Sequence, residues 1–154
     1  LAWNRTYKVP YVIVRPTNNY GIGQHPEKLI PKVCKFLSIG RKIPLHNQGE
    51  PYRMWLHAKD TANAIITIIE NGKTNEIYNI SGNFEQKNIE TVNKILDLYS
   101  AELVSYKKEK IFDFTYDRDG QDVRYSVDDS KLRKLGWEPK CNFDDESRKS
   151  KFRL

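Results

Sequence analysis

Amide, lysine and arginine side chains stand at loop and strand-end positions along this chain. They are Asn18, Asn19, Lys28, Arg53, Asn88 and Arg118. Arginine presents a planar fork to phosphate oxygens, lysine supplies a point charge at a helix start, and asparagine can donate to and accept from sugar hydroxyls. Each of them alone is more often a solvated surface group. Together they indicate a candidate site for a polar, phosphorylated ligand, and their joint value depends on how they are arranged.

Two patterns associated with dinucleotide enzymes are weak here. Gly21-Ile22-Gly23 begins like a phosphate-binding loop, but Pro26 stands where the third glycine belongs. Tyr106 and Lys110 have the Tyr-x-x-x-Lys spacing of a dehydrogenase catalytic pair, although they lie in a charged connection where accident is the better explanation. Neither pattern therefore identifies a catalytic residue in this chain.

Metal and disulfide chemistry is also disfavoured. His25, His46 and His57 have no cysteine or carboxylate partner at ligand spacing. Cys34 and Cys141 are far apart in the chain, which suits neither a disulfide framework nor a zinc site. We predict no metal site, and a reducing, cytoplasmic location.

The composition describes a basic folded domain. The chain has 154 residues, 38% of them hydrophobic and 30% charged, with a formal net charge of +6. Such a charge makes an anionic partner plausible, whether nucleic acid, a phosphorylated metabolite or an acidic protein, although most basic domains merely carry solvated lysines. No stretch approaches the about 18 apolar residues that a membrane span needs, so no membrane partner is expected.

The elements that would position these side chains alternate between strands and helices. Residues 1–7 are typical of a helix end, and the apolar run at 11–14 predicts a buried parallel strand. Residues 27–39 have apolar positions at helical spacing, and strands are predicted at 43–46 and 52–57.

The same alternation continues through the second half of the chain. Asp60 is predicted to cap a helix whose apolar face is Ala62, Ile65, Ile66 and Ile69. Further predictions are strands at 76–80, 111–116 and 124–127, a helix opening at Asn88, a short helix after Asp128 or Asp129 that stops at Gly136, and no element after Pro139. The predicted fold class is therefore α/β.

The arrangement of motifs resembles the extended short-chain dehydrogenase/reductases that act on nucleotide sugars, and among them the dTDP-glucose 4,6-dehydratases. The matching residues, in order, are Asn18-Asn19-Tyr20-Gly21, Pro26-Glu27-Lys28-Leu29-Ile30-Pro31, Pro44-Leu45-His46 with Gly49, Arg53 before Trp55-Leu56, Tyr78-Asn79-Ile80, Asn88, Asp117-Arg118 with Asp122 and Arg124-Tyr125, and Leu135-Gly136-Trp137-Glu138-Pro139. They cover almost the whole chain.

The resemblance implies roles for the first half of these residues. Asn18, Lys28 and Leu29 would contact the nucleotide sugar, and Asn19 would lie by the nicotinamide end of NAD. Most NAD contacts would come from an N-terminal half that this chain lacks. NAD is thus the implied cofactor, and dTDP-glucose the implied substrate.

The later residues would bind the nucleotide. Pro44 and His46 would lie along the thymine nucleoside, Arg53 and Asn88 would hold the diphosphate and its surroundings, and Arg118 would close from the other side. Gln121 would also contact the substrate, in a position where family members often have histidine.

The resemblance further implies the C-terminal part of an extended short-chain dehydrogenase, with the last strands and helix of a Rossmann-type parallel sheet and a small mixed α/β lobe. Segments 1–24 and 52–82 would complete the nucleotide-binding sheet, and segments 25–51 and 83–154 would form the substrate-binding lobe. The full-length enzyme, a lyase and homodimer, would oxidise C4, eliminate water across C5 and C6, and reduce C6. This chain alone would be inactive.

Three other hypotheses stay open at this point. The chain could belong to another nucleotide-sugar enzyme, an epimerase or decarboxylase, although the dehydratase-type motifs make this less favoured. It could instead be a non-catalytic binding module, or a basic nucleic-acid binder; our expectation is that nucleic acid is not a partner.

Overall fold

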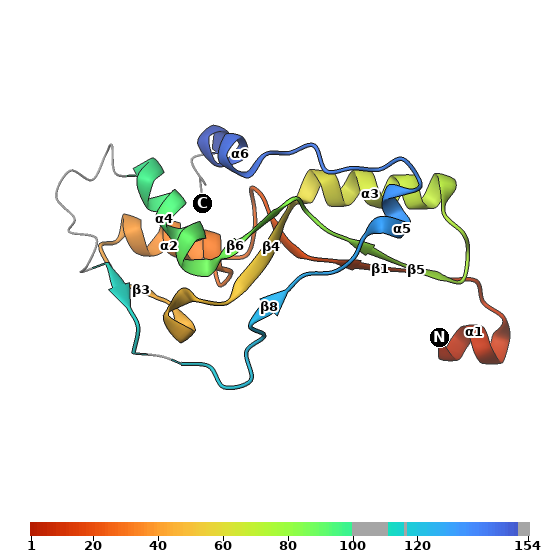
Figure 1. The fold of residues 1–154 in the computed structure, drawn as a ribbon, viewed down its shortest axis with the longest axis horizontal. Coiled ribbons are helices and arrows are strands. Elements are labelled where there is room, and N and C mark those ends of the chain that lie inside the picture. The colour runs from red at the N-terminus through yellow and green to blue at the C-terminus, as the bar shows by residue number, and fades with distance from the viewer. Residues whose placement is uncertain (100–110, 116, 151–154) are drawn as a thin grey trace.

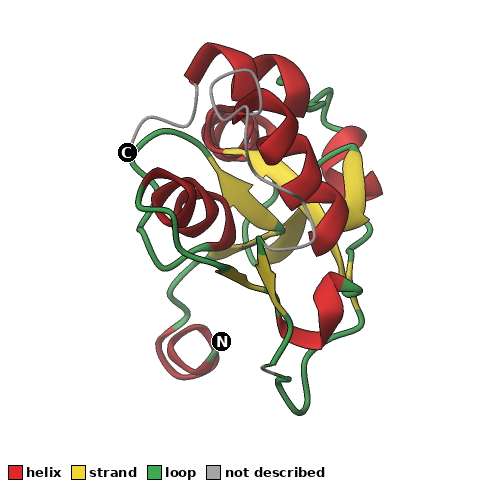
Figure 2. Ribbon diagram, turned by 90° about the vertical axis from the view of Figure 1, so that its left-hand side faces the viewer, coloured by secondary structure: helices red, strands yellow, loops and turns green. Residues whose placement is uncertain are grey.

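The computed structural model describes residues 1–99, 111–115 and 117–150, in which helices and strands alternate as in an α/β protein. The Tyr106 and Lys110 pair lies outside these described residues. The first element is helix α1 (Ala2–Tyr7), none of whose residues is buried. Strands lie in the centre of the molecule with helices on either side (Figure 2).

In two of the parallel strand pairs, the first strand of one pair follows the first strand of the other almost directly in the chain. Strand β1 (Val12–Pro16) pairs with β5 (Glu76–Ile80), and β2 (Asn18–Tyr20) pairs with β4 (Tyr52–His57) (Figure 1). Only Thr17 separates β1 from β2, and its N–H donates to Ile80 O at 2.9 Å. The strands predicted at 11–14, 52–57 and 76–80 are therefore confirmed, but the burial predicted for the first is wrong, because no residue of β1 is buried and Val12 is 42% exposed.

Strand β4 is the centre of a mixed sheet. It also pairs antiparallel with β6 (Phe84–Lys87) and parallel with β8 (Arg124–Tyr125). Strands β3 (Ile43–Pro44) and β7 (Phe112–Asp113) form a separate parallel pair. The sequence prediction missed β6, and it made the strands at β3, β7 and β8 too long, because each of these pairs covers two residues before the chain turns away.

Apolar side chains gather in two clusters. The first lies among α2 (Leu29–Ser38), α4 (Asn88–Tyr99) and β3, and includes Tyr20, Trp55 and Phe143. The second joins β5 to α3 (Ala58–Asn71) through Leu56, Ala64, Ile68, Tyr78, Ile80, Leu132 and Trp137. The division of the chain into two lobes stays a prediction, and in this structure Leu132 and Trp137 lie in the cluster of α3 and β5.

Helix α3 turns a different face to the core from the one predicted. Its buried apolar residues are Ala64 and Ile68, whereas Ile65, Ile66 and Ile69 are 37%, 51% and 77% exposed. Spacing alone could not choose between these faces, because both carry apolar residues at helical intervals.

Asp60 is not the cap of α3. The capping residue is His57, whose Nδ1 accepts from the Lys59 N–H at 3.2 Å. Asp60 lies in the first turn, 2% exposed, and its carboxylate accepts from the backbone N–H groups of Lys140 (3.1 Å) and Cys141 (2.9 Å). The carboxylate thus holds the segment that follows Pro139 against the start of α3.

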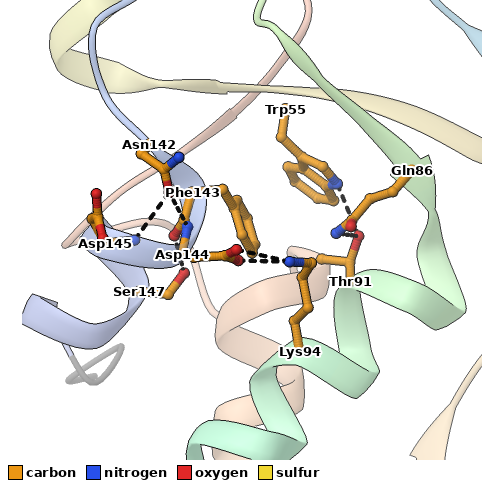
Figure 3. A network of polar contacts seen from close by, with 9 residues as sticks. All are labelled: Trp55, Gln86, Thr91, Lys94, Asn142, Phe143, Asp144, Asp145 and Ser147. Atoms are coloured by element: carbon orange, nitrogen blue, oxygen red, sulfur yellow. Dashed lines mark hydrogen bonds and ion pairs between the residues drawn. The ribbon is translucent and has the colours of Figure 1, made fainter.

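The charged C-terminal stretch contains a helix that the sequence prediction missed. After the short helix α5 (Ser130–Arg133), helix α6 (Phe143–Ser150) begins where Asn142 Oδ1 accepts from the N–H groups of Asp144 and Asp145 at 2.9 and 3.2 Å. Lys94 on α4 forms an ion pair with Asp144 at 2.8 Å (Figure 3). Phe143 is buried in the first cluster, so this ion pair and this ring attach α6 to the body of the protein.

Candidate functional site

The amide pair on β2 is positioned by the pairing of β2 with β4. Asn19 Nδ2 donates to Thr17 O at 2.9 Å, and its Oδ1 accepts from the Thr61 hydroxyl on α3 at 2.5 Å. Gln24 Nε2 donates to the main-chain oxygen of Asn19 at 2.7 Å. Successive residues of a strand point to opposite faces, so Asn18 is directed away from these bonds. Among the described residues, no hydrogen bond of the Asn18 side chain is recorded.

Lys28 and Leu29 stand at the beginning of α2. Lys28 is the exposed N-cap residue, and its N–H donates to His25 O at 3.0 Å. Leu29 is half-buried and packs against the first apolar cluster. The lysine head group is exposed at the helix start. A bound anion there would be attracted both by the ammonium group and by the unpaired N–H groups of the first turn.

A tight turn that contains His46 packs against the start of α4 through Gly49. The 3-10 turn η1 (His46–Gly49) follows β3, which contains Pro44. A Cβ added at Gly49 would lie 2.8 Å from Ile89 Cβ, so only glycine allows this close approach. The Asn88 N–H also donates to Pro51 O at 3.1 Å. Pro44, His46 and Asn88 are thereby brought into one region.

Two arginines reach the same region from a distant segment and from β4. The Asn47 N–H donates to Asp117 Oδ1 at 3.1 Å, and the Arg118 N–H donates to Asn47 Oδ1 at 3.0 Å. Arg53 Nη1 donates to Asp122 O at 2.9 Å and to the main-chain oxygen of the preceding residue, Tyr52, at 2.6 Å. These bonds bring segment 117–122 onto residues 46–53.

Gln121 lies within that segment and is half-buried. Its Oε1 atom is buried and has no hydrogen-bond partner in the part of the chain that the structure describes. A buried amide oxygen without a donor costs free energy, so a group that donates to it would be stabilising.

The structure thus arranges the predicted residues in two groups. The first group lies on β2 and at the start of α2 and consists of Asn18, Asn19, Lys28 and Leu29. The second group lies on segments that are bonded or packed to one another and consists of Pro44, His46, Arg53, Asn88, Arg118 and Gln121. The β2–β4 pairing connects Asn18 and Asn19 to the strand of Arg53, and within the described residues no bond joins Lys28 to the second group. Asn47 and Thr61 were missed by sequence reasoning. The Asn47-Gln48-Gly49 turn signal was the only indication for Asn47, and Thr61 had none.

A separate cavity of about 230 Å³ lies at the end of β4, and none of the predicted site residues lines it. Its walls include Tyr20, His57, Asp60 and Phe143. His57 Nε2 is 3.9 Å from Glu146 Oε2 on α6. Burial lowers the pKa of His57 below its usual 6.5, although the nearby Glu146 and Asp60 carboxylates oppose this. Burial also raises the pKa of the Tyr20 phenol.

His57 is expected to make stability depend on pH. Because its pKa is lower in the folded chain, the unfolded chain binds protons more tightly, and stability falls as pH drops below 6.5. We expect chemical unfolding between pH of about 7 and about 5.5 to show this loss, and a His57→Gln variant to have a flatter profile. Glu76 and Glu85, whose pKa values are lowered by Lys131 and Arg124, lose their contributions only below pH 4.5.

The matched control for this experiment is His25→Gln, because the His25 side chain is 69% exposed. This variant should keep the slope of the parent chain. Equal slopes for the parent and His57→Gln would contradict the assignment to His57.

No group of three or more metal-ligating side chains occurs among the residues that the structure describes. Among the same residues, no helix is long and apolar enough to cross a membrane.

The geometry and the motifs agree with one family of proteins. The model of the GDP-mannose 4,6 dehydratase family matches residues 1–149, and the chain belongs to this family. It is 41% identical to the dTDP-glucose 4,6-dehydratase of Shigella flexneri over 152 residues, which are 97% of this chain and 42% of that protein. The resemblance seen in the sequence is thereby confirmed, and the chain spans less than half the length of the relatives that it matches.

Solved structures show the same fold. The dTDP-glucose 4,6-dehydratase DesIV of Streptomyces venezuelae, solved with NAD bound, superposes with a TM-score of 0.86 at 37% identity, over 96% of this chain and 44% of that one. A UDP-glucuronic acid 4-epimerase of Bacillus cereus reaches a TM-score of 0.82 at 17% identity, over 98% of this chain and 47% of that one. The second comparison shows the fold alone, and the α/β prediction is confirmed.

Proposed function

We propose that this chain is the sugar-nucleotide-binding portion of an NAD-dependent dTDP-glucose 4,6-dehydratase. The observation that carries the proposal is that turn η1 lies beside both the start of α4 and the backbone of Arg118, while Arg53 on β4 is bonded to the far end of the same segment. We infer that the two arginine side chains and the helix N-terminus bind a diphosphate. The 41% identity to a dTDP-glucose dehydratase favours this enzyme class over an epimerase.

In this proposal the second group of residues binds the nucleotide. Arg53 and Arg118 hold the diphosphate from two sides, with Asn88 at the helix start between them. Pro44 and His46 lie along the base and ribose. The unpartnered Oε1 of Gln121 accepts a hydrogen bond from the ligand, which relieves its desolvation.

The first group serves the sugar and the cofactor side. Asn18, Lys28 and Leu29 contact the sugar, and Asn19 lies toward the nicotinamide. NAD, when bound, supplies the acceptor and donor of hydride. Both ends of the Asn19 amide are already engaged by Thr17 O and Thr61 Oγ1, so this residue fits the role of fixing β2 in position. Most cofactor contacts and the acid, base and hydride-transfer partners come from residues outside this chain.

The wider setting is part of the same proposal. The complete enzyme is a cytoplasmic lyase and homodimer, and this chain alone is inactive. Cys34 and Cys141 are not joined in a disulfide, which supports a reducing compartment.

A titration separates the candidate functions. The purified chain is titrated by calorimetry with dTDP, UDP and a short oligonucleotide, each at low and high salt. We expect binding of dTDP that is at least about tenfold tighter than that of UDP, a difference of about 1.4 kcal/mol.

Each other outcome identifies an alternative. Equal binding of dTDP and UDP would contradict the dehydratase assignment and favour an epimerase. Tighter binding of the oligonucleotide, falling steeply with salt, would indicate a nucleic-acid binder. No binding of any ligand would reject the proposed function of the chain.

A further inference from the structure

Asn47 joins two parts of the candidate site that are far apart in the chain. Its main-chain N–H donates to the Asp117 carboxylate at 3.1 Å, and its side-chain Oδ1 accepts from the Arg118 N–H at 3.0 Å. One residue of turn η1 therefore both donates to and accepts from the segment that carries Arg118. Such a reciprocal pair restrains the backbone of Arg118 more than one bond would.

The turn that carries Asn47 is itself held in place. Asn47 and Gln48 have φ values of 50° and 54°, and Gly49 has 75°, so three successive residues are left-handed. Asparagine tolerates this conformation better than most residues. On its other side the turn packs through Gly49 against Ile89 at the start of α4. Asn47 is thus a fixed point to which segment 117–118 is attached.

Segment 117–122 has a second attachment at its other end, where Arg53 Nη1 donates to Asp122 O at 2.9 Å. Arg118 and Gln121 lie between these two attachments. Arg53 both holds the segment and is proposed to bind the diphosphate. Asn47 only holds the segment and has no proposed contact with the ligand. Loss of the Asn47 Oδ1 acceptor would release the Arg118 N–H and leave the bonds at Asp117 and Asp122 in place.

We propose that Asn47 is a positioning residue for the nucleotide diphosphate, which acts by holding the backbone of Arg118 beside turn η1. This inference rests on the proposed function of the site. Asn47 itself need not touch the ligand. Its effect is carried by the bond from the Arg118 N–H to Oδ1.

The test is a double-mutant cycle on dTDP binding, with Asn47→Gly, Arg118→Gln and the double variant. Glycine keeps the left-handed backbone and the N–H that donates to Asp117, so only the Oδ1 acceptor is lost. We expect Asn47→Gly to weaken dTDP binding about tenfold in the parent chain and less than about twofold in the Arg118→Gln background. Amide hydrogen exchange at Arg118 should be faster in Asn47→Gly before ligand is added.

Asn75→Gly is the matched control. Asn75 is also left-handed, with φ 64°, and its Oδ1 also accepts from a backbone N–H, that of Tyr11 at 3.3 Å. Its loss should leave dTDP binding within about twofold of the parent chain.

Two results would overturn the inference: equal weakening by Asn47→Gly in both backgrounds, or unchanged exchange at the Arg118 amide. A parent chain that binds no dTDP would reject the proposed function instead. In that case the exchange measurement still decides whether Asn47 holds the segment.

Discussion

A Gly82→Ala variant is expected to be strongly destabilised. Gly82 lies between β5 and β6, and a Cβ at this position would be 1.9 Å from Trp55 O and 2.8 Å from Trp55 C. Both atoms belong to the backbone of β4, which is fixed by pairing with β2, β6 and β8. The clash cannot be relieved by rotating a side chain. We expect a loss of about 4 kcal/mol or more, a large part of the about 5–15 kcal/mol that stabilises a typical domain.

Urea unfolding followed by circular dichroism measures this loss. Gly23→Ala is the control, because nothing lies within 4 Å of its added Cβ and only its φ of 81° disfavours alanine. That variant should lose about 1 kcal/mol. Similar midpoints for the two variants would show that β4 can move away from Gly82.

An Arg53→Ala variant is expected to lose about a hundredfold in dTDP affinity, equivalent to about 2.8 kcal/mol. A guanidinium in contact with a diphosphate forms charge-assisted bonds of about 1.5–3 kcal/mol each. The same change removes the bond to Asp122 O, which ties segment 117–122 to β4. Arg53→Lys keeps the charge without the planar fork, so we expect an intermediate loss of about tenfold.

Calorimetric titration with dTDP measures these losses, and Arg41→Gln controls for the change in net charge. Arg41 is exposed, its guanidinium lies over the Phe36 ring, 5.1 Å from the centroid, and it is not among the residues assigned to the ligand. The Arg41→Gln chain should bind dTDP as the parent chain does. An Arg53→Ala chain that binds dTDP normally would place the diphosphate elsewhere.

The parts of the fold that could be predicted from sequence are those that depend on local pattern. The apolar run at 11–14 became β1, and the helical spacing after Pro26 became α2. Strand β6 was missed because most of its residues are polar and it is held by partners that the local pattern does not reveal. Gln86 donates to Thr91 Oγ1 on α4 at 2.7 Å, and Glu85 forms an ion pair at 2.7 Å with Arg124, which is 39 positions away. No rule of alternating apolar residues could have found it.

Helix α6 was missed for a related reason. Phe143 and Ser147 are its two buried side chains among those described, and acidic residues fill its first turn. A pattern of so few inward positions is too weak to identify a helix. What makes the stretch helical is the Asn142 cap together with the packing of Phe143 in the first cluster.

The set of residues in the candidate site stays a prediction, and their arrangement could not be predicted from the sequence. The types of Arg53, Asn88 and Arg118 suggested phosphate binding, and the family resemblance supplied their roles. The bonds of Asn47 to Asp117 and Arg118 join residues 70 and 71 positions apart. Only the folded chain brings these residues together, because no local signal specifies such a pairing.

The single-residue link between β1 and β2 limits how this stretch of the chain can change in length. Because side chains alternate along a strand, inserting or deleting one residue near Thr17 would exchange the faces of Asn18 and Asn19. Asn19 would then lose Thr61, and Asn18 would turn toward α3. The length of the stretch from Val12 to Tyr20 is therefore more strictly constrained than its residue types. Over evolutionary time, substitutions in it should be better tolerated than insertions or deletions.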